Sequence, residues 1–271
     1  MFFLEKCARM LRHMPALRRM KFFWDFITPA YECVLKLLYG NTLRRRINNT
    51  DSVYIPFHLR RFTGTYEIDI WKKAMDEVRL GDTVADVGAF FGFYTFPFLK
   101  RVGPYGRVVA FEPDPGNLAF LKSITKRYTM GLRLEIVGFA VGQSRGKLKF
   151  DAQGISTSSV AIESNPKGQV MEVACVSLDE FFADEKLDII KIDVEGYEEK
   201  VLAGARNILK RKSGYPRAIF IEVHPYAWNV YGTSDTALLD ILADAGYKVK
   251  NVNGDTMFAL KEYGAIMALR E

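Results

Sequence analysis

Charged side chains alternate with apolar residues through Ile189–Glu198, in the stretch Ile-Ile-Lys-Ile-Asp-Val-Glu-Gly-Tyr-Glu. Lys191, Asp193 and Glu195 stand at every second position, and this alternation is typical of a strand and its exit. Because a buried charge is costly unless it is paired, three charges at one strand end predict a binding or catalytic site. The alternative is a structural ion pair between Lys191 and a neighbouring carboxylate.

A second group of chemically active side chains closes the strand-like stretch Phe220–Pro225. Glu222 and His224 are two positions apart, so both lie on the same side of the strand. Histidine acts as a general base near neutral pH, and we expect His224 to take the proton of a hydroxyl group. Asp193 is the second candidate for this base, and Glu222 would orient the imidazole. The alternative is a divalent cation held by Asp193, Glu195 or Glu222, which would lower the pKa of the hydroxyl.

A glycine-containing turn follows the first strand of the pattern. Asp86 and Gly88 close that strand and Gly92 ends the turn, with the spacing G-x-x-x-G. This spacing differs from the G-x-G-x-x-G arrangement that binds a pyrophosphate, so a cofactor without phosphate groups fits better. S-adenosylmethionine qualifies, because Asp86 can offset its positive charge. Glu112 ends the second strand, where a carboxylate can accept hydrogen bonds from both ribose hydroxyls.

Strands and helices alternate along the chain from residue 80 onward. Strands are predicted at Thr83–Val87, Arg107–Phe111, Leu134–Val137, Leu187–Ile192 and Ala218–Val223, and helices at Tyr94–Lys100, Pro115–Arg127, Gly196–Leu209 and Asp235–Ala245. This order is typical of an α/β fold with a doubly wound, mostly parallel sheet. The C-terminal end predicts an antiparallel hairpin, since Asn-Gly separates two strand-like stretches, Tyr247–Val252 and Thr256–Leu260. A sheet of this kind with a final hairpin is the Rossmann-like layout of class I methyltransferases.

Together and in this order, the motifs resemble the FkbM methyltransferase family. They are Asp86-Val-Gly-Ala-Phe-Phe-Gly, Phe111-Glu-Pro, Leu178-Asp, Ile190-Lys-Ile-Asp-Val-Glu-Gly-Tyr-Glu, Leu202-Ala-Gly-Ala and Ile221-Glu-Val-His-Pro, preceded by Gly64-Thr-Tyr66-Glu67. The resemblance covers about residues 64–260. It implies an S-adenosylmethionine-dependent enzyme that methylates a hydroxyl group on a sugar, a glycan or another small metabolite.

The resemblance also implies a role for each matching residue. The cofactor contacts would be Tyr66, Glu67, Asp86, Gly88, Phe90, Gly92, Glu112, Ala140 and Asp193. The acceptor would lie against Lys191, Glu195, Glu222 and His224. The chain departs from the family pattern at Phe90 and Phe91, where the family commonly has an asparagine. Two other functions stay open: an RNA or protein methyltransferase that uses a basic N-terminal arm, and a cofactor-binding protein without catalysis.

Charge is unevenly distributed along the 271 residues. Residues 1–46 contain ten Lys or Arg and three Asp or Glu, so their net charge is +7, whereas residues 47–271 carry −1. We therefore predict a basic, amphipathic helical segment at 1–60, in which Arg44–Arg46 would be a solvated helix end. The methyltransferase domain would span 61–271, with an insertion at about 143–180 that contains the strand-like pieces Lys147–Phe150 and Val170–Val176.

The basic segment and the overall composition also bear on partners and location. Residues 1–46 predict a cap on the main domain, a homo-oligomer contact or a peripheral membrane contact. The nearly neutral remainder argues against a nucleic-acid groove. Three cysteines without paired spacing argue against a zinc site or a disulfide framework and favour a reducing cytoplasm. Since neither a signal peptide nor a spanning helix is predicted, we expect a cytoplasmic protein, with attachment to the inner membrane surface as the alternative.

Overall fold

A computed structural model of the chain describes residues 40–60, 62, 64–128, 131–152, 159–160 and 169–270, together with positions 10, 20, 24, 27–29, 31, 33–34 and 36–37. Contacts divide the chain into two compact units. One consists of residues 1–44 and 55–62, and the other of residues 45–54 and 63–271. The second unit contains all of the site residues that the sequence predicts.

The predicted N-terminal segment is corrected where the structure describes it. Most of residues 1–39, for which the sequence predicts helix, lie outside the described residues, so their membrane, oligomer and capping roles stay predictions. Strands β1 (Thr42–Ile47) and β2 (Asp51–Pro56) pair in a two-stranded sheet. Arg44–Arg46 therefore lie on a strand and not at a helix end. Buried apolar residues recur at alternate positions here, and Asn48 and Asn49 supply the positive φ angles of the connecting turn.

Among the residues that the structure describes, no helix is both long enough and apolar enough to cross a membrane.

A seven-stranded sheet forms the centre of the second unit within the described residues. Its strands are β3 (Thr83–Val87), β4 (Arg107–Phe111), β5 (Arg133–Val137), β10 (Ile189–Ile192), β11 (Ala218–Val223), β12 (Lys248–Asn251) and β13 (Gly264–Leu269). Their spatial order is β12-β13-β11-β10-β3-β4-β5. The last five strands of this order are parallel, and β13 is antiparallel to both of its neighbours. The predicted fold class is confirmed.

The predicted C-terminal hairpin is wrong in its second half. Thr256 forms an isolated bridge with Lys250, but Thr256–Leu260 is not a strand. The antiparallel partner of β12 is β13, which is buried at Ile266, Met267 and Ala268. Because β13 is apolar, its position between β11 and β12 buries apolar surface and pairs both of its edges. Thr256–Leu260 at the end of the sheet would bury less apolar surface and leave one edge unpaired.

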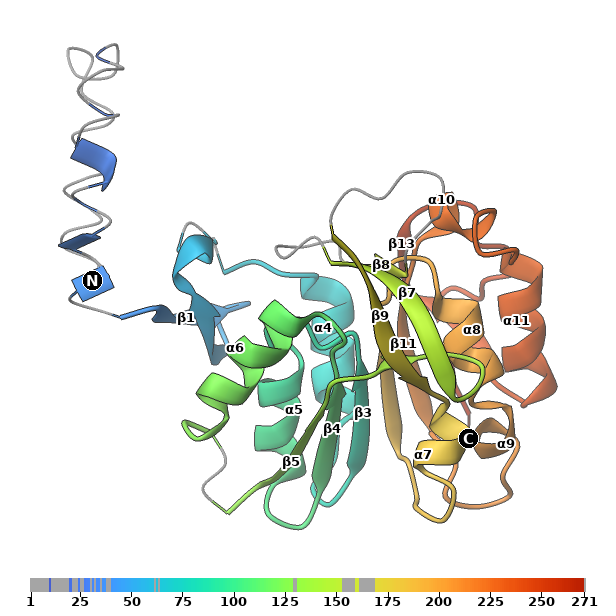
Figure 1. Cartoon of the computed structure of the whole chain (residues 1–271). Coiled ribbons are helices and arrows are strands. Elements are labelled where there is room, and N and C mark those ends of the chain that lie inside the picture. Colours follow the sequence, from blue (N-terminus) through green and yellow to red (C-terminus); the bar gives the residue numbers. More distant parts are fainter. Residues whose placement is uncertain are drawn as a thin grey trace. The chain divides into compact units, whose positions relative to one another are not determined.

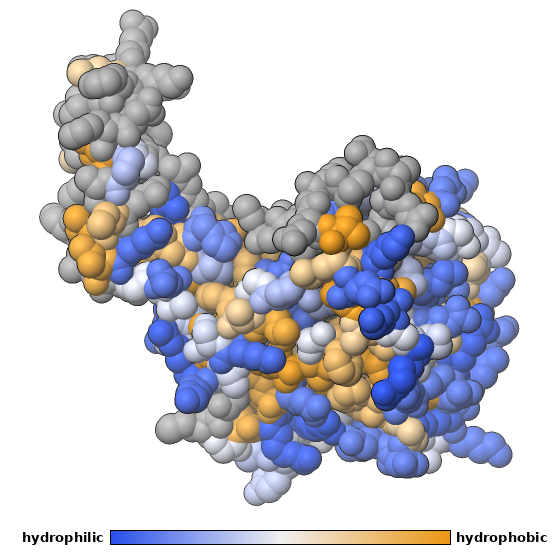
Figure 2. All heavy atoms as spheres, viewed as in Figure 1, coloured by the Kyte–Doolittle hydropathy of each residue, from blue (hydrophilic) through white to orange (hydrophobic). Residues whose placement is uncertain are grey.

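Helices cover both faces of this sheet (Figure 1). Those on one side are α4 (Ile68–Glu77), α5 (Thr95–Val102) and α6 (Pro115–Thr125). Those on the other side include α7 (Leu178–Phe181), α8 (Glu198–Ala203), α9 (Arg206–Leu209) and α11 (Asp235–Asp244). A short helix, α10 (Pro225–Trp228), follows β11 directly. Figure 2 shows hydrophilic residues over the C-terminal helices, as expected for the exposed faces of amphipathic helices, and exposed apolar residues in the middle of the view.

The predicted helix at Gly196–Leu209 is divided into α8 and α9. The Asp179 carboxylate accepts hydrogen bonds from the backbone N–H groups of Asn207 and Ile208, at 3.0 and 2.8 Å. A carboxylate in this position stabilises the start of a helix. The chain therefore begins a second short helix instead of continuing the first.

A smaller, four-stranded sheet stands in the predicted insertion. Its strands are β6 (Ala140–Val141), β7 (Gly146–Ala152), β8 (Ser159–Val160) and β9 (Gln169–Val176). Strands β7 and β9 confirm the two strand-like pieces that the sequence predicts. The Ser/Thr-rich residues 153–158 lie outside the described residues.

Two glycines with similar backbone angles test how closely the chain packs where β3 ends. Gly88 has φ +80°, and a Cβ there would lie 1.8 Å from the backbone oxygen of Asp193; Gly81 has φ +88° and open space. Gly81→Ala should cost only the left-handed strain, about 1–2 kcal/mol. Gly88→Ala adds a clash with backbone and should lower the free energy of unfolding by about 3–5 kcal/mol. Urea unfolding of both variants measures the difference, and equal losses would contradict the close approach of Gly88 to Asp193.

Candidate functional site

A cavity of about 330 Å³ lies at the carboxyl ends of β3, β4, β10 and β11. Parallel strands present these ends at one edge of the sheet, which is where ligands bind in open α/β folds. The predicted site residues that line the cavity are Tyr66, Glu67, Gly88, Phe90, Glu112, Ala140, Asp193, Glu195 and Glu222. Residues from six separate parts of the sequence are therefore brought together as predicted.

Backbone strain is concentrated around this cavity. Among the described residues other than glycine, positive φ angles occur at Glu67, Phe90 and Glu195, at 38°, 51° and 53°, and in the Asn48-Asn49 turn. The first three residues all line the cavity. A positive φ angle costs free energy in any residue other than glycine, and residues with this backbone conformation cluster at binding and active sites. The strain therefore marks the cavity as a functional site independently of its residue types.

Four predicted site residues do not line the cavity: Asp86, Gly92, Lys191 and His224. Asp86 is fully buried, and its Oδ2 accepts a hydrogen bond from Thr95 Oγ1 at 2.5 Å. Burial raises the pKa of this carboxyl, which the Lys191 ammonium partly offsets. A Cβ at Gly92 would lie 2.4 Å from the Phe96 ring, so this glycine is required by packing. Asp86 and Gly92 thus contact the first turn of α5, through Thr95 and Phe96, and do not line the cavity.

Glu112 is held in place by the backbone. Its Oε2 accepts from the Phe90 N–H at 2.7 Å and its Oε1 from the Asp114 N–H at 2.9 Å. Burial raises the pKa of Glu112 to about 8, although these backbone donors lower it. A carboxylate oxygen has more than one lone pair, so both oxygens can accept further hydrogen bonds from a ligand in the cavity.

Lys191 is buried among carboxyl groups. Its Nζ lies 3.1 Å from Asp193 Oδ2 and donates to the Gly88 carbonyl oxygen at 3.4 Å. Burial lowers the pKa of Lys191, but the carboxylates of Asp193, Asp86, Glu67 and Glu222 raise it above the usual range. Lys191 is therefore a permanent cation within the site, as in the ion-pair alternative, and it does not line the cavity.

His224 is held by a carboxylate that the sequence analysis did not assign. Its Nδ1 donates to Glu198 Oε1 at 2.7 Å, and Glu198 is fully buried. Burial lowers the pKa of His224, but the hydrogen bond to Glu198 and the nearby carboxylates raise it to about 9. The expectation that Glu222 orients the imidazole is wrong, because Glu222 instead accepts a hydrogen bond from Tyr263.

Burial also changes the acidity of Glu222. Together with the charges of Asp193 and Glu67, it raises the pKa of this carboxyl to about 8. Glu222 and Asp193 lie at the ends of neighbouring strands. Both carboxyl groups interact electrostatically with the Lys191 ammonium group.

The sequence analysis missed three residues of the site: Tyr263 and Asn117, which line the cavity, and Glu198, which holds His224. Tyr263 lies 41 positions after its partner Glu222, and no local motif links the two. Glu198 belongs to the motif after β10, but its spacing is equally typical of the first turn of a helix. Asn117 lines the cavity one turn into α6, where the sequence pattern shows only an amphipathic helix.

A residue 18 positions earlier in the chain holds the backbone of Tyr66 beside the cavity. The Asn48 side chain donates to the Tyr66 carbonyl oxygen at 2.7 Å and accepts from the Tyr66 N–H at 2.9 Å. The strand-turn segment before Gly64 thus positions a residue that the family motif predicts as a cofactor contact.

Known proteins are similar to this chain in sequence and in fold. The methyltransferase FkbM domain matches residues 86–249. The hexuronic acid methyltransferase AglP of Haloferax volcanii is 26% identical over 164 residues, which are 58% of this chain and 62% of that protein. The chain thus spans less than two thirds of the length of this relative.

Two solved structures show the same kind of similarity. The SAM-dependent O-methyltransferase of Thermotoga maritima is 15% identical, with a TM-score of 0.44 over 85% of this chain and 78% of that one. Aeropyrum pernix fibrillarin, solved with natively bound S-adenosyl-L-methionine, is 13% identical, with a TM-score of 0.41 over 84% of this chain and 94% of that one.

Because the family match covers more than half of the chain and runs from the end of β3 into β12, the protein belongs to the FkbM methyltransferase family.

Proposed function

We propose that the protein is an S-adenosylmethionine-dependent O-methyltransferase that acts on a hydroxyl group of a sugar. The observation that supports this most is the layout of the cavity, which has Glu112 at the end of β4 and an acidic group at the ends of β10 and β11. Strands β10 and β11 are two and three strands away from β4 in the sheet, or about 9–14 Å at the usual strand spacing. Such a span suits a cofactor with a ribose at one end and a positive charge at the other.

The β4 end of the cavity has the groups that a ribose requires. Glu112 offers two carboxylate oxygens, and the neighbouring Asn117 has a buried Oδ1 without a hydrogen-bond partner among the described residues. A buried acceptor of this kind is rare and indicates a missing ligand or water. Ribose hydroxyls are donors that satisfy both side chains, so the residues present fit the cofactor.

The opposite end of the cavity favours positive charge. Glu67, Asp193, Glu195 and Glu222 all line it. When bound, S-adenosylmethionine would supply a methyl group that is attached to a positively charged sulfur. The acceptor oxygen would attack the carbon of this methyl group as the acceptor loses its own proton. The acidic side chains stabilise positive charge at this end, and Gly88 lets the backbone approach closely.

A sugar is the acceptor class that the surroundings of this end support. Tyr263 and Tyr226 are exposed aromatic residues whose rings both contact the His224 ring, and their hydroxyls donate to Glu222 and Glu195, respectively. Aromatic faces together with carboxylates match the apolar and hydroxyl faces of a sugar ring. The similar protein of Haloferax volcanii is a hexuronic acid methyltransferase, which supports the same acceptor class.

Glu112→Gln should weaken cofactor binding. The amide has one acceptor oxygen where the carboxylate has two, and hydrogen bonds to charged groups contribute about 1.5–3 kcal/mol each. We expect the Kd of S-adenosylhomocysteine, measured by calorimetry, to rise about tenfold to a hundredfold. Glu172→Gln, on the exposed face of β9, is the control and should leave the Kd unchanged. Equal Kd values for all three proteins would contradict the ribose assignment.

The pH dependence of this binding gives a second test of Glu112. Since its pKa is raised to about 8, the accepting carboxylate form becomes populated as the pH rises through that value. Wild-type affinity should therefore increase between pH 6.5 and 9 relative to Glu112→Gln, in which this group does not titrate. The ratio of the two Kd values removes the titration of the ligand itself. A ratio that stays constant with pH would show that Glu112 does not bind as a carboxylate.

His224→Ala and His224→Gln should slow methyl transfer without affecting the cofactor. Groups that assist proton removal contribute about 10²–10⁴-fold to turnover, so we expect losses in this range. Radiolabelled methyl transfer to methyl glycosides of glucuronic acid, galacturonic acid and glucose, with mass spectrometry of the products, measures both acceptor class and rate. If S-adenosylhomocysteine binding were lost with turnover, His224 would have a structural role. If wild-type protein bound cofactor but methylated none of these sugars, the acceptor proposal would be wrong.

A further inference from the structure

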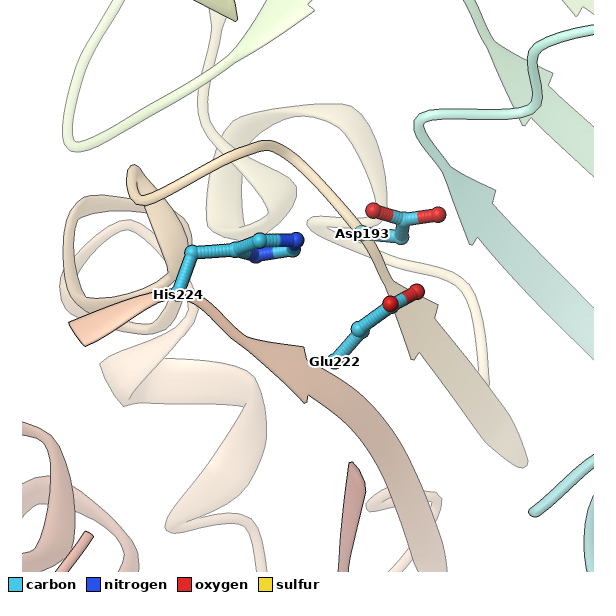
Figure 3. A group of neighbouring side chains, drawn as sticks. All are labelled: Asp193, Glu222 and His224. Carbon is cyan, nitrogen blue, oxygen red and sulfur yellow. The ribbon is translucent and has the colours of Figure 1, made fainter. Parts of the chain in front are cut away.

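Three metal-ligand side chains meet at the ends of two neighbouring strands. Asp193 follows β10, whereas Glu222 and His224 belong to the end of β11, and these strands are parallel and adjacent. One ligand atom from each residue lies within 4.8 Å of the others. Figure 3 shows the imidazole of His224 directed toward the carboxylates of Asp193 and Glu222.

The imidazole is fixed as it is in many metal sites. His224 is 3% exposed, and its Nδ1 is bonded to Glu198 Oε1. Glu198 is itself held by the Trp228 indole N–H at 2.9 Å and the Gly196 N–H at 2.8 Å. Metal-binding histidines almost always donate their second ring nitrogen to a carboxylate or carbonyl, which fixes the ring. The chain therefore presents Nε2 in a defined direction.

This Nε2 has no hydrogen bond to any described residue. The nearest carboxylate oxygen, Glu195 Oε2, lies 3.6 Å away. This ring nitrogen faces carboxylates at distances longer than a hydrogen bond, so the geometry leaves a position for a cation between them. One imidazole and two carboxylates are ligands that Mn²⁺ and related divalent ions accept.

The charge at this position also calls for a cation. Asp193, Glu195 and Glu222 all line this end of the cavity. Of these three carboxylates, only that of Asp193 lies within hydrogen-bonding distance of the Lys191 ammonium group. An acceptor that carries its own carboxylate, such as a uronic acid, would be repelled here. A divalent cation reverses the sign of the local charge and provides coordination positions for acceptor oxygens.

We propose that Asp193, Glu222 and His224 bind a divalent cation, and that this cation binds the oxygen atoms of an anionic sugar acceptor. The second part rests on the proposed function. The bound cation lowers the pKa of a coordinated hydroxyl. During transfer the new carbon–oxygen bond forms, the carbon–sulfur bond breaks, and the hydroxyl proton passes to Glu195 or to solvent. His224 is then a metal ligand, and the cation takes over the role that the sequence analysis gave to a histidine base.

Titration of the full chain with Mn²⁺ tests the site without any acceptor. We expect one equivalent to bind, measured by calorimetry and by the loss of the free Mn²⁺ signal in electron paramagnetic resonance. Glu222→Gln and His224→Gln should each weaken this binding at least about tenfold, whereas Glu172→Gln should not change it. Circular dichroism establishes that each variant is folded. No binding to wild-type protein at millimolar Mn²⁺, or equal binding to folded variants, would overturn the proposal.

Two further measurements separate this inference from the proposed function. S-adenosylhomocysteine binding is measured on the same samples with EDTA and with Mn²⁺, and it should be retained in both. Methyl transfer to the glucuronide should be lost in EDTA and restored by Mn²⁺. Transfer that persists in EDTA would overturn the cation proposal and leave the proposed function intact. Mn²⁺ binding at the three residues without cofactor binding would support the metal site and contradict the proposed function.

Discussion

The buried ammonium group of Lys191 is the interaction on which the site depends. It lies on the central strand β10, beside Asp86 of β3 in the strand register, and its Nζ contacts Asp193 and the Gly88 carbonyl. A buried lysine is stable only when opposite charges surround it, and here it holds carboxylates from several strands in one place. Removing it would leave those carboxylates to repel each other, so the cavity would lose its shape together with its charge balance.

Backbone geometry contributes as much to the cavity as side-chain chemistry does. Gly88 lies so close to the Asp193 backbone that no side chain fits between them, and three cavity residues take positive φ angles. The surrounding sheet has to stabilise this strain. Within this strained segment Phe90 donates its N–H to Glu112, so the glycine loop and the carboxylate proposed to bind the ribose are fixed as one unit.

The distribution of charge divides the cavity into two functional ends. Glu112 and Asn117 present hydrogen-bond acceptors, whereas Glu67, Asp193, Glu195 and Glu222 give the opposite end a surplus of acidic groups. Positive charge from a ligand relieves that surplus. The sulfonium proposal and the cation proposal therefore share one physical cause, and His224 is the side chain that the cation proposal adds.

The sequence by itself determined the local features. Strands β4 and β11 were predicted with their observed bounds, and Glu112, Asp193 and Glu222 were placed at strand ends, because alternation of period two identifies a strand and its exit. Tertiary structure alone decided which distant groups meet. It buried Asp86 below the loop, paired His224 with Glu198, brought Tyr263 to Glu222 and inserted β13 between β11 and β12. Sequence periodicity shows on which face of a strand or helix a side chain lies. How deeply that side chain is buried, and which residue it contacts, depend on packing between segments far apart in the chain.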